Sequence, residues 1–211
     1  MDENLEEYIC SHIDPEPEHL RRLGRDVHLQ LLYPRMCSGH LQGRVLKILT
    51  AMIAPVRALE IGTYAGYSAL CIAEALPTGG HLDTVEIDDE MEDFIRTRFA
   101  DAGADDRITL HIGDFEAIAP TLSPGYDMAY MDANKRTYLS TFNLVRKLVR
   151  PGGFIIADNT LWAGKVTDPT TNHDAQTRGI CEFNDAIAAD PTLEKAILPL
   201  RDGLTLIRVL K

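Results

Sequence analysis

Two apolar segments of the sequence each end in side chains that carry oxygen. Met131 is followed by Asp132, and Ala157 is followed by Asp158 and Asn159. Two carboxylates and an amide oxygen are hard ligands, of the kind that Mg²⁺, Mn²⁺ and Ca²⁺ prefer. If both segments are strands of one parallel sheet, the three side chains meet at one edge and predict a divalent cation site. The alternative is ordinary loop chemistry, because Asp and Asn are common in turns.

A second set of residues indicates a nucleoside site. The glycine turn 62–66 follows an expected strand at 58–61, and Glu86 lies near the end of the next expected strand, 81–87. Glycine lets the backbone approach a ligand closely, and an acid at this place can accept both hydroxyls of a ribose. A plain tight turn and a surface acid are the alternative, but the two features together favour a nucleoside.

The glycine turn favours S-adenosylmethionine over a dinucleotide. A pyrophosphate-binding turn needs G-x-G-x-x-G, whereas this turn has Tyr64 in the place of the second glycine and an acid, Glu60, before it. An acid repels a pyrophosphate and attracts an ammonium group. S-adenosylmethionine has a ribose and an amino-acid end but no phosphate. A weaker signal is Asp114, which follows the third strand where an acceptor can meet the adenine amino group.

The elements that position these residues alternate along the chain, which predicts an α/β fold with a mostly parallel sheet and helices on both faces. The turn Arg201-Asp202-Gly203 predicts that the last two strands are antiparallel. We expect a single domain, 1–211, with an N-terminal helical lid or oligomer segment at 1–53 and an α/β core at 54–211. The expected strands are 58–61, 81–87, 108–112, 126–131, 154–157, 193–198 and 204–210, and the expected helices are 16–32, 38–52, 67–76, 88–99, 136–149 and 176–189.

Composition limits the class of partner. The 211 residues carry a formal net charge of -11, and 45% of them are hydrophobic. Such an acidic chain repels phosphate backbones and anionic lipids, so neither nucleic acid nor membrane is an expected partner. The four cysteines are scattered without a C-x-x-C pair, which argues against a zinc site or a disulfide framework. Together with the polar, acidic first residues, this predicts a cytoplasmic protein.

Several of these motifs resemble one family. The segments 59–68 (LEIGTYAGYS), 132–135 (DANK) and 158–162 (DNTLW) are similar, in this order, to the metal-dependent O-methyltransferases of the caffeoyl-CoA and catechol type and their bacterial relatives. Met36-Cys37-Ser38 with Gly43 and the later 201–204 (RDGL) also look like this family. The resemblance runs from about Tyr33 onward, and several motifs in order are more specific than any one of them.

The resemblance implies a Rossmann-like methyltransferase fold, with a seven-stranded sheet whose last strand is reversed, and commonly a homodimer. It implies that Lys135 is catalytic together with Asp132, and that Trp162 lines the substrate pocket. Asn134 stands where the plant enzymes have a second Asp, which changes how that loop meets the cofactor. The implied metal ligands are Asp132, Asp158 and Asn159, and the implied S-adenosylmethionine contacts are Ser38, Glu60, Gly62, Thr63, Ser68, Glu86, Asp114, Phe115 and Asn134.

The expected reaction is an in-line methyl transfer to a catechol, another phenolic vicinal diol or an acyl-CoA ester, with Lys135 as the base. The metal is expected to be Mg²⁺, with Mn²⁺ or Ca²⁺ as alternatives. Two other functions remain open: a non-catalytic S-adenosylmethionine-binding protein, and an NAD-dependent oxidoreductase on a similar fold. Substrate selection is expected in the N-terminal segment and in the loop 162–178.

Overall fold

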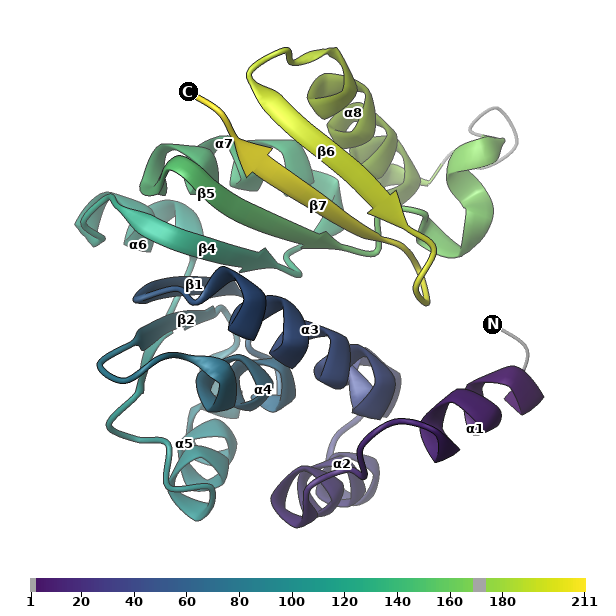
Figure 1. The fold of residues 1–211 in the computed structure, drawn as a ribbon, viewed down its shortest axis with the longest axis vertical. Helices are drawn as coiled ribbons and strands as arrows, with labels where there is room; N and C mark the ends of the chain where they lie inside the picture. Colours follow the sequence, from purple (N-terminus) through teal and green to yellow (C-terminus); the bar gives the residue numbers. More distant parts are fainter. Residues whose placement is uncertain (1–2, 169–173) are drawn as a thin grey trace. The chain divides into compact units, whose positions relative to one another are not determined.

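The computed structural model describes residues 3–168 and 174–211. Its seven strands form one sheet in the order β3-β2-β1-β4-β5-β7-β6. The neighbours β4, β5, β7 and β6 can be followed in Figure 1. The described pairings β1–β4, β2–β3 and β4–β5 are parallel, whereas β7 is antiparallel to both of its neighbours, β5 and β6. The predicted α/β class, the seven strands and the reversed last strand are therefore confirmed.

The chain packs as two compact units, and the segment 57–62 belongs to the second of them. The first unit comprises the described residues up to Val56 and Thr63–Gly113. Its elements are α1 (Glu3–Ser11), α2 (Glu18–Gln30), η1 (Pro34–Met36), α3 (Gly39–Ile53), α4 (Tyr67–Ala75), β2 (His81–Glu86), η2 (Asp89–Met91), α5 (Glu92–Asp101) and β3 (Ile108–Ile112).

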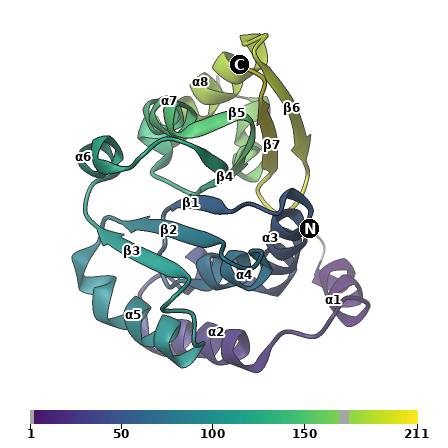
Figure 2. The same cartoon turned by 60° about the vertical axis from the view of Figure 1, so that its left-hand side comes forward.

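Close packing of α3 on α4 organises the first unit. A Cβ atom on Gly43 would lie 2.6 Å from Cε1 of Tyr67 and 2.7 Å from Sγ of Cys71. A larger residue would therefore separate the two helices. In the same unit β2 and β3 run side by side in register, with Leu82 opposite Ile108 (Figure 2).

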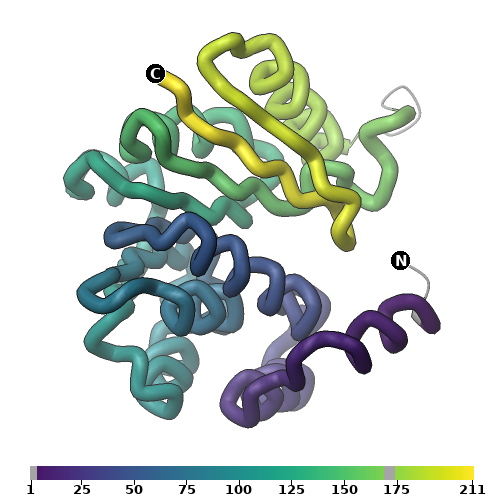
Figure 3. The backbone as a smooth tube through the Cα atoms, viewed as in Figure 1, coloured from purple at the N-terminus to yellow at the C-terminus, as the bar shows by residue number. Residues whose placement is uncertain are grey.

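The second unit comprises 57–62 and the described part of Asp114–Lys211. Helices α7 and α8 pack against each other and against its strands (Figure 1), and β6 runs into β7 through a tight turn (Figure 3). The elements are β1 (Arg57–Ile61), α6 (Phe115–Ile118), η3 (Ala119–Thr121), β4 (Tyr126–Met131), η4 (Lys135–Thr137), α7 (Tyr138–Leu148), β5 (Val149–Asp158), η5 (Trp162–Thr167), α8 (Ala175–Ala189), β6 (Leu193–Leu198) and β7 (Leu204–Val209).

The structure corrects several predicted boundaries. The helix predicted at 88–99 begins with the 3-10 turn η2, so α5 runs from Glu92 to Asp101. The strand predicted at 154–157 begins at Val149, because the chain pairs with β4 on both sides of the 151–153 segment, with a register shift between Tyr126 and Met128. The helix predicted from 136 starts instead with the 3-10 turn η4, so α7 begins at Tyr138. Neither α1 nor the short α6 was predicted. The expected division at 53/54 remains a prediction.

Buried strands explain why the site is held firmly. Four of the five residues of β1 and the last four of β4 are buried, as is typical of parallel strands covered on both faces. Their backbone groups pair within the sheet, so the residues just beyond the strands have little freedom. In the described parts of the chain, no helix combines the length and apolarity needed to cross a bilayer.

Candidate active site

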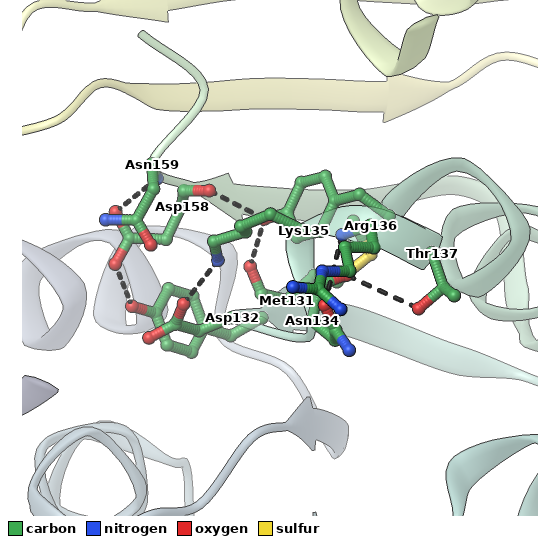
Figure 4. Close-up of polar contacts among 10 residues, drawn as sticks. Met131, Asp132, Asn134, Lys135, Arg136, Thr137, Asp158 and Asn159 are labelled. Carbon is green, nitrogen blue, oxygen red and sulfur yellow. Dashed lines mark hydrogen bonds and ion pairs between the residues drawn. The ribbon is translucent and has the colours of Figure 1, made fainter. Parts of the chain in front are cut away.

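The second unit brings Asp132 close to Asp158 and Asn159, as predicted for two neighbouring strands. Met131 pairs with Ala157 across β4 and β5, so Asp132 and Asp158 follow at neighbouring strand ends. The backbone N–H of Asp132 donates to the carbonyl oxygen of Ile61 at 2.9 Å, which ties the first residue after β4 to the end of β1. Carboxylates from two strands therefore meet at one edge of the sheet (Figure 4).

Gly62 allows this approach of β1 to β4. Its φ of 95° lies in the left-handed region, and a Cβ atom there would stand 2.3 Å from the carbonyl oxygen of Asp132. Any other residue would collide with the backbone of Asp132 and adopt an unfavourable conformation. Gly62 therefore allows the backbone of Asp132 to lie close to the end of β1. This packing role is independent of the role predicted for Gly62 in cofactor binding.

Asp158 is buried and held by two donors. The residue exposes only 4% of its surface to solvent. The hydroxyl of Tyr130 donates to Oδ2 at 2.8 Å, and the backbone N–H of Asn159 donates to Oδ1 at 2.8 Å. Asn159 itself has a φ of 59°, a left-handed conformation that Asn tolerates better than most residues. These contacts fix the carboxylate in one orientation (Figure 4).

Lys135 reaches back to Asp132 from the start of η4. Its Nζ lies 2.6 Å from Oδ1 of Asp132 and 4.6 Å from the centre of the Tyr138 ring. The lysine is only 7% exposed, so the ion pair forms in a largely dry place where charges interact more strongly than in water. Lys135 and Asp132 thus form an ion pair, with the ammonium lying over an aromatic face; their catalytic role remains a prediction.

The backbone of Lys135 is fixed by α8. A Cβ atom on Gly179 would lie 2.1 Å from the carbonyl oxygen of Lys135 and 3.2 Å from Cα of Arg136. Glycine is unfavourable in a helix interior by about 1 kcal/mol relative to alanine. Here it allows α8 to pack directly on the turn that carries the lysine.

Two buried phenols surround the carboxylates. Burial, followed by the negative charges of Asp158 and Asp132, raises the pKa of Tyr130 well above its usual value. Burial also raises the pKa of Tyr138, and Asp132 and Asp158 add to this effect. Both phenols therefore remain protonated hydrogen-bond donors. The negative charges of the two carboxylates favour this protonated state.

The two carboxylates and the neighbouring amide oxygen fit a hard divalent cation. A cation would be attracted by two carboxylates and would find oxygen ligands on Asp132, Asp158 and Asn159. Within the described residues, no three His, Cys, Asp or Glu side chains gather in a way that could hold a metal ion. The expected set is of another kind, since one of its three members is an amide.

Residues of the first unit that are predicted to bind the nucleoside lie beside one another. Glu86 is 7% exposed; its Oε2 accepts from the backbone N–H of Tyr64 at 2.6 Å and its Oε1 from that of Asp88 at 2.9 Å. Each carboxylate oxygen can accept a further hydrogen bond, which suits a pair of ribose hydroxyls. Beside it, the hydroxyls of Thr63 and Thr84 lie 2.6 Å apart.

The remaining predicted cofactor residues occupy helix starts and strand ends. Ser38 immediately precedes α3, and the buried Ser68 lies in the first turn of α4, which packs on α3. Glu60 is fully buried in β1. Asp114 accepts from the backbone N–H of Glu116 at the start of α6, followed by the buried Phe115. Asn134 accepts from the N–H of Arg136 at 3.1 Å and is exposed. Their roles toward the cofactor remain predictions.

The loop after Asn159 is clamped by the turn between β6 and β7. The N–H of Leu161 donates to the carbonyl of Asp202 at 2.7 Å, and a Cβ atom on Gly203 would lie 2.7 Å from the N atom of Leu161. Trp162 follows with a φ of 46°, and its buried indole N–H has no hydrogen-bond partner among the described residues. Part of the predicted substrate loop, residues 169–173, lies outside the described residues.

Sequence reasoning missed Tyr130, Tyr138 and Gly179. Tyr130 reads as one more apolar residue of a buried strand, and Tyr138 as the first aromatic of a helix. Gly179 gave a usable signal, because an isolated glycine inside an expected helix often has a packing reason.

Comparison with known proteins identifies the family of this chain. A family profile described as O-methyltransferase matches residues 10–210. Caffeoyl-CoA O-methyltransferase 2 of Zea mays is 34% identical over 210 residues, which cover 93% of this chain and 78% of the maize protein. Caffeoyl-CoA O-methyltransferase of Stellaria longipes is 29% identical, covering 98% of this chain and 90% of that protein.

Solved structures give the same answer. The O-methyltransferase TomG from Streptomyces achromogenes, involved in tomaymycin synthesis and solved in complex with S-adenosylmethionine, is 31% identical with a TM-score of 0.91, covering 99% of this chain and 96% of TomG. An O-methyltransferase from Bacillus cereus, in complex with S-adenosylhomocysteine, is 28% identical with a TM-score of 0.90, covering 99% and 97%. The chain therefore belongs to the O-methyltransferase family and is an S-adenosylmethionine-dependent O-methyltransferase.

Proposed function

We propose that this methyltransferase acts on a small phenolic vicinal diol, free or as an acyl-CoA ester, and that it needs a divalent cation. The observation that carries the proposal is the pairing of Asp132 and Asp158 at adjacent strand ends, with Lys135 2.6 Å from Asp132. Two carboxylates on a rigid sheet edge attract positive charge; Lys135 supplies part of it, and a divalent cation would supply the rest. The caffeoyl-CoA O-methyltransferases among the relatives support an acceptor of this class.

Asp132, Asp158 and Asn159 would hold the cation, with Mg²⁺ as the first candidate and Mn²⁺ or Ca²⁺ as alternatives. When bound, the cation lowers the pKa of a coordinated hydroxyl and orients the acceptor. A cation held in this way would bind the hydroxyl groups of the acceptor. Tyr130 and the N–H of Asn159 fix the Asp158 carboxylate that would hold it.

Lys135 is the proposed general base. In its unprotonated form, Nζ takes the proton from the acceptor hydroxyl. The oxygen then attacks the methyl carbon of the sulfonium in line, the carbon–sulfur bond breaks, and S-adenosylhomocysteine leaves. The protein contributes mainly by holding the lysine and the acids in fixed positions, since orientation is worth on the order of 7–11 kcal/mol at best.

The cofactor roles are also part of the proposal. Glu86 would accept the ribose hydroxyls, and the acid Glu60 would attract the amino group of S-adenosylmethionine. The glycine turn with Thr63 and Ser68 would border the same ligand, with Asp114 or Phe115 near the adenine and Ser38 and the Asn134 loop at its edge. A homodimer in the cytoplasm completes the proposal, and all four cysteines, which lie in the described residues, are free thiols as a reducing compartment requires.

The test is methyl transfer from labelled S-adenosylmethionine to 3,4-dihydroxybenzoate and to caffeoyl-CoA, with and without chelator. We expect turnover that needs added Mg²⁺ or Mn²⁺ and that Lys135→Ala abolishes. Lys147→Ala, which removes an exposed lysine of α7, is the matched control and should keep full activity. Turnover that is unaffected by the chelator would refute the metal proposal, and cofactor binding without turnover on either diol would refute the acceptor class.

A further inference from the structure

Two tyrosine hydroxyls meet the ends of β4 and β5, the strands that carry the acids. Tyr130 and Tyr138 are both fully buried. The hydroxyl of Tyr130 donates to Oδ2 of Asp158 at 2.8 Å. The hydroxyl of Tyr138 lies 2.7 Å from the carbonyl oxygen of Met131 and 2.7 Å from that of Asp158.

The hydroxyl of Tyr138 bridges two strand ends. Its single proton serves two carbonyl oxygens, one at the last residue of β4 and one at the last residue of β5. Met131 immediately precedes Asp132, so the hydroxyl bridges the backbone next to one acid and the backbone of the other. The ring of the same residue lies under the ammonium of Lys135.

We propose that Tyr130 and Tyr138 are positioning residues, which set the separation and orientation of Asp132 and Asp158 for methyl transfer. Tyr138 joins the two strand ends, and Tyr130 holds the carboxylate of Asp158. This inference rests on the proposed function for its catalytic meaning, but not for the hydrogen bonds themselves. Neither tyrosine touches the reacting atoms; both act through the acids.

Removal of each hydroxyl should have a distinct effect on the two acids. Phenylalanine in place of Tyr138 keeps the ring under Lys135 but leaves two carbonyl oxygens without their shared donor, so the strand ends lose one link beyond their pairing in the sheet. Phenylalanine in place of Tyr130 leaves Oδ2 of Asp158 without this donor and lets the carboxylate rotate. Loss of groups that orient metal ligands typically weakens metal binding or activity by 10–100-fold, so we expect about tenfold for each variant.

The experiment compares Tyr130→Phe and Tyr138→Phe with Tyr126→Phe. Tyr126 is a matched control, because it is a buried tyrosine at the opposite end of β4, so its variant also loses one buried hydroxyl. The readouts are Mn²⁺ affinity of the cofactor-free protein by calorimetry, kcat and KM for the diol, thermal stability, and hydrogen exchange at the amides of Asp132 and Asn159.

We expect the two test variants to bind Mn²⁺ about tenfold more weakly and to lose kcat with little change in KM for S-adenosylmethionine. Tyr138→Phe should also speed amide exchange at both strand ends, whereas Tyr126→Phe should change only thermal stability. The proposal is overturned if the test variants match wild type, or if Tyr126→Phe shows the same losses.

Hydrogen exchange separates this inference from the proposed function. If wild-type protein neither binds Mn²⁺ nor needs it for turnover, the metal proposal fails. The positioning role is then decided by amide exchange and kcat alone: faster exchange at Asp132 and Asn159 in Tyr138→Phe supports it, and unchanged exchange overturns it.

Discussion

Glu86 and Asp158 are both buried carboxylates at the end of a strand, but different kinds of groups hold them. Glu86, in the first unit, accepts from two backbone N–H groups, those of Tyr64 and Asp88. Asp158, in the second unit, accepts from the side chain of Tyr130 as well as from the N–H of Asn159. The orientation of Glu86, the proposed cofactor acid, is thus set by the main chain. The proposed metal ligand depends on a second side chain and is more open to change by substitution.

The strongest test of this contrast is Asp158→Asn. The amide can keep the N–H of Asn159 and turn its NH2 group toward the Tyr130 hydroxyl, which then accepts, so the variant loses the charge and one oxygen ligand. We expect turnover to fall by on the order of a thousandfold, as for the loss of several kcal/mol of metal-assisted stabilisation. Binding of S-adenosylmethionine, measured by calorimetry, should stay close to wild type. A large loss of cofactor affinity would show that the two carboxylates are not independent.

A second test addresses the backbone that supports Lys135. Gly179→Ala should destabilise the protein by about 2 kcal/mol, because the added methyl group meets the carbonyl of Lys135. Gly24→Ala is the control: it lies inside α2 with nothing within 4 Å of its Cβ position, so it should stabilise by up to about 1 kcal/mol. Urea unfolding measures both, and opposite signs are expected. Equal shifts would contradict the packing argument.

Glu86→Gln is the corresponding test of the carboxylate in the first unit. It places an amide opposite two N–H donors, so one hydrogen bond to the backbone is lost together with the charge. Hydrogen bonds to charged groups contribute about 1.5–3 kcal/mol, so we expect the affinity for S-adenosylmethionine to fall by roughly 10–100-fold. Mn²⁺ affinity should not change. A parallel fall in Mn²⁺ affinity would remove the distinction between the two acids.

The smallest expected effect concerns the first turn of α8. Hydrogen bonds from the hydroxyl and N–H of Thr177 lower the pKa of Asp174 to about 2. A lowered pKa gives stability that is present above the unfolded value, near 4, and is lost as the pH falls through about 2. Asp174→Ala should therefore lower the melting temperature slightly at pH 6 and not at pH 2, with unchanged kcat. Asp185→Ala, an exposed acid of α8, should leave this pH dependence intact.

Much of the fold followed from the sequence because its signals are local. Apolar runs such as Tyr126–Met131 predict buried strands, and Arg201-Asp202-Gly203 predicts the hairpin; both are confirmed. The start of β5 was missed because Pro151-Gly152-Gly153 reads as a turn. In the structure these residues continue the strand across a register shift in its pairing with β4.

The candidate site was predictable in part for the same reason. Acids at strand ends can be read from alternation of apolar and polar residues, and the resemblance named Lys135. Tyr138 could not be found in this way, since its hydroxyl meets the carbonyl of Asp158, 20 residues away in sequence. Such contacts depend on the sheet order and on the packing of α7, which no local pattern encodes.

The order of strands has a consequence for how the protein is made. β6 is synthesised before β7 but joins the sheet only through it. The clamp on the loop after Asn159 uses Asp202 and Gly203, from the turn that β7 closes. A nascent chain that has reached β6 therefore already contains every proposed metal ligand but lacks the clamp on the segment that follows two of them. The loop after Asn159 should therefore become ordered late in translation, when the hairpin of β6 and β7 closes.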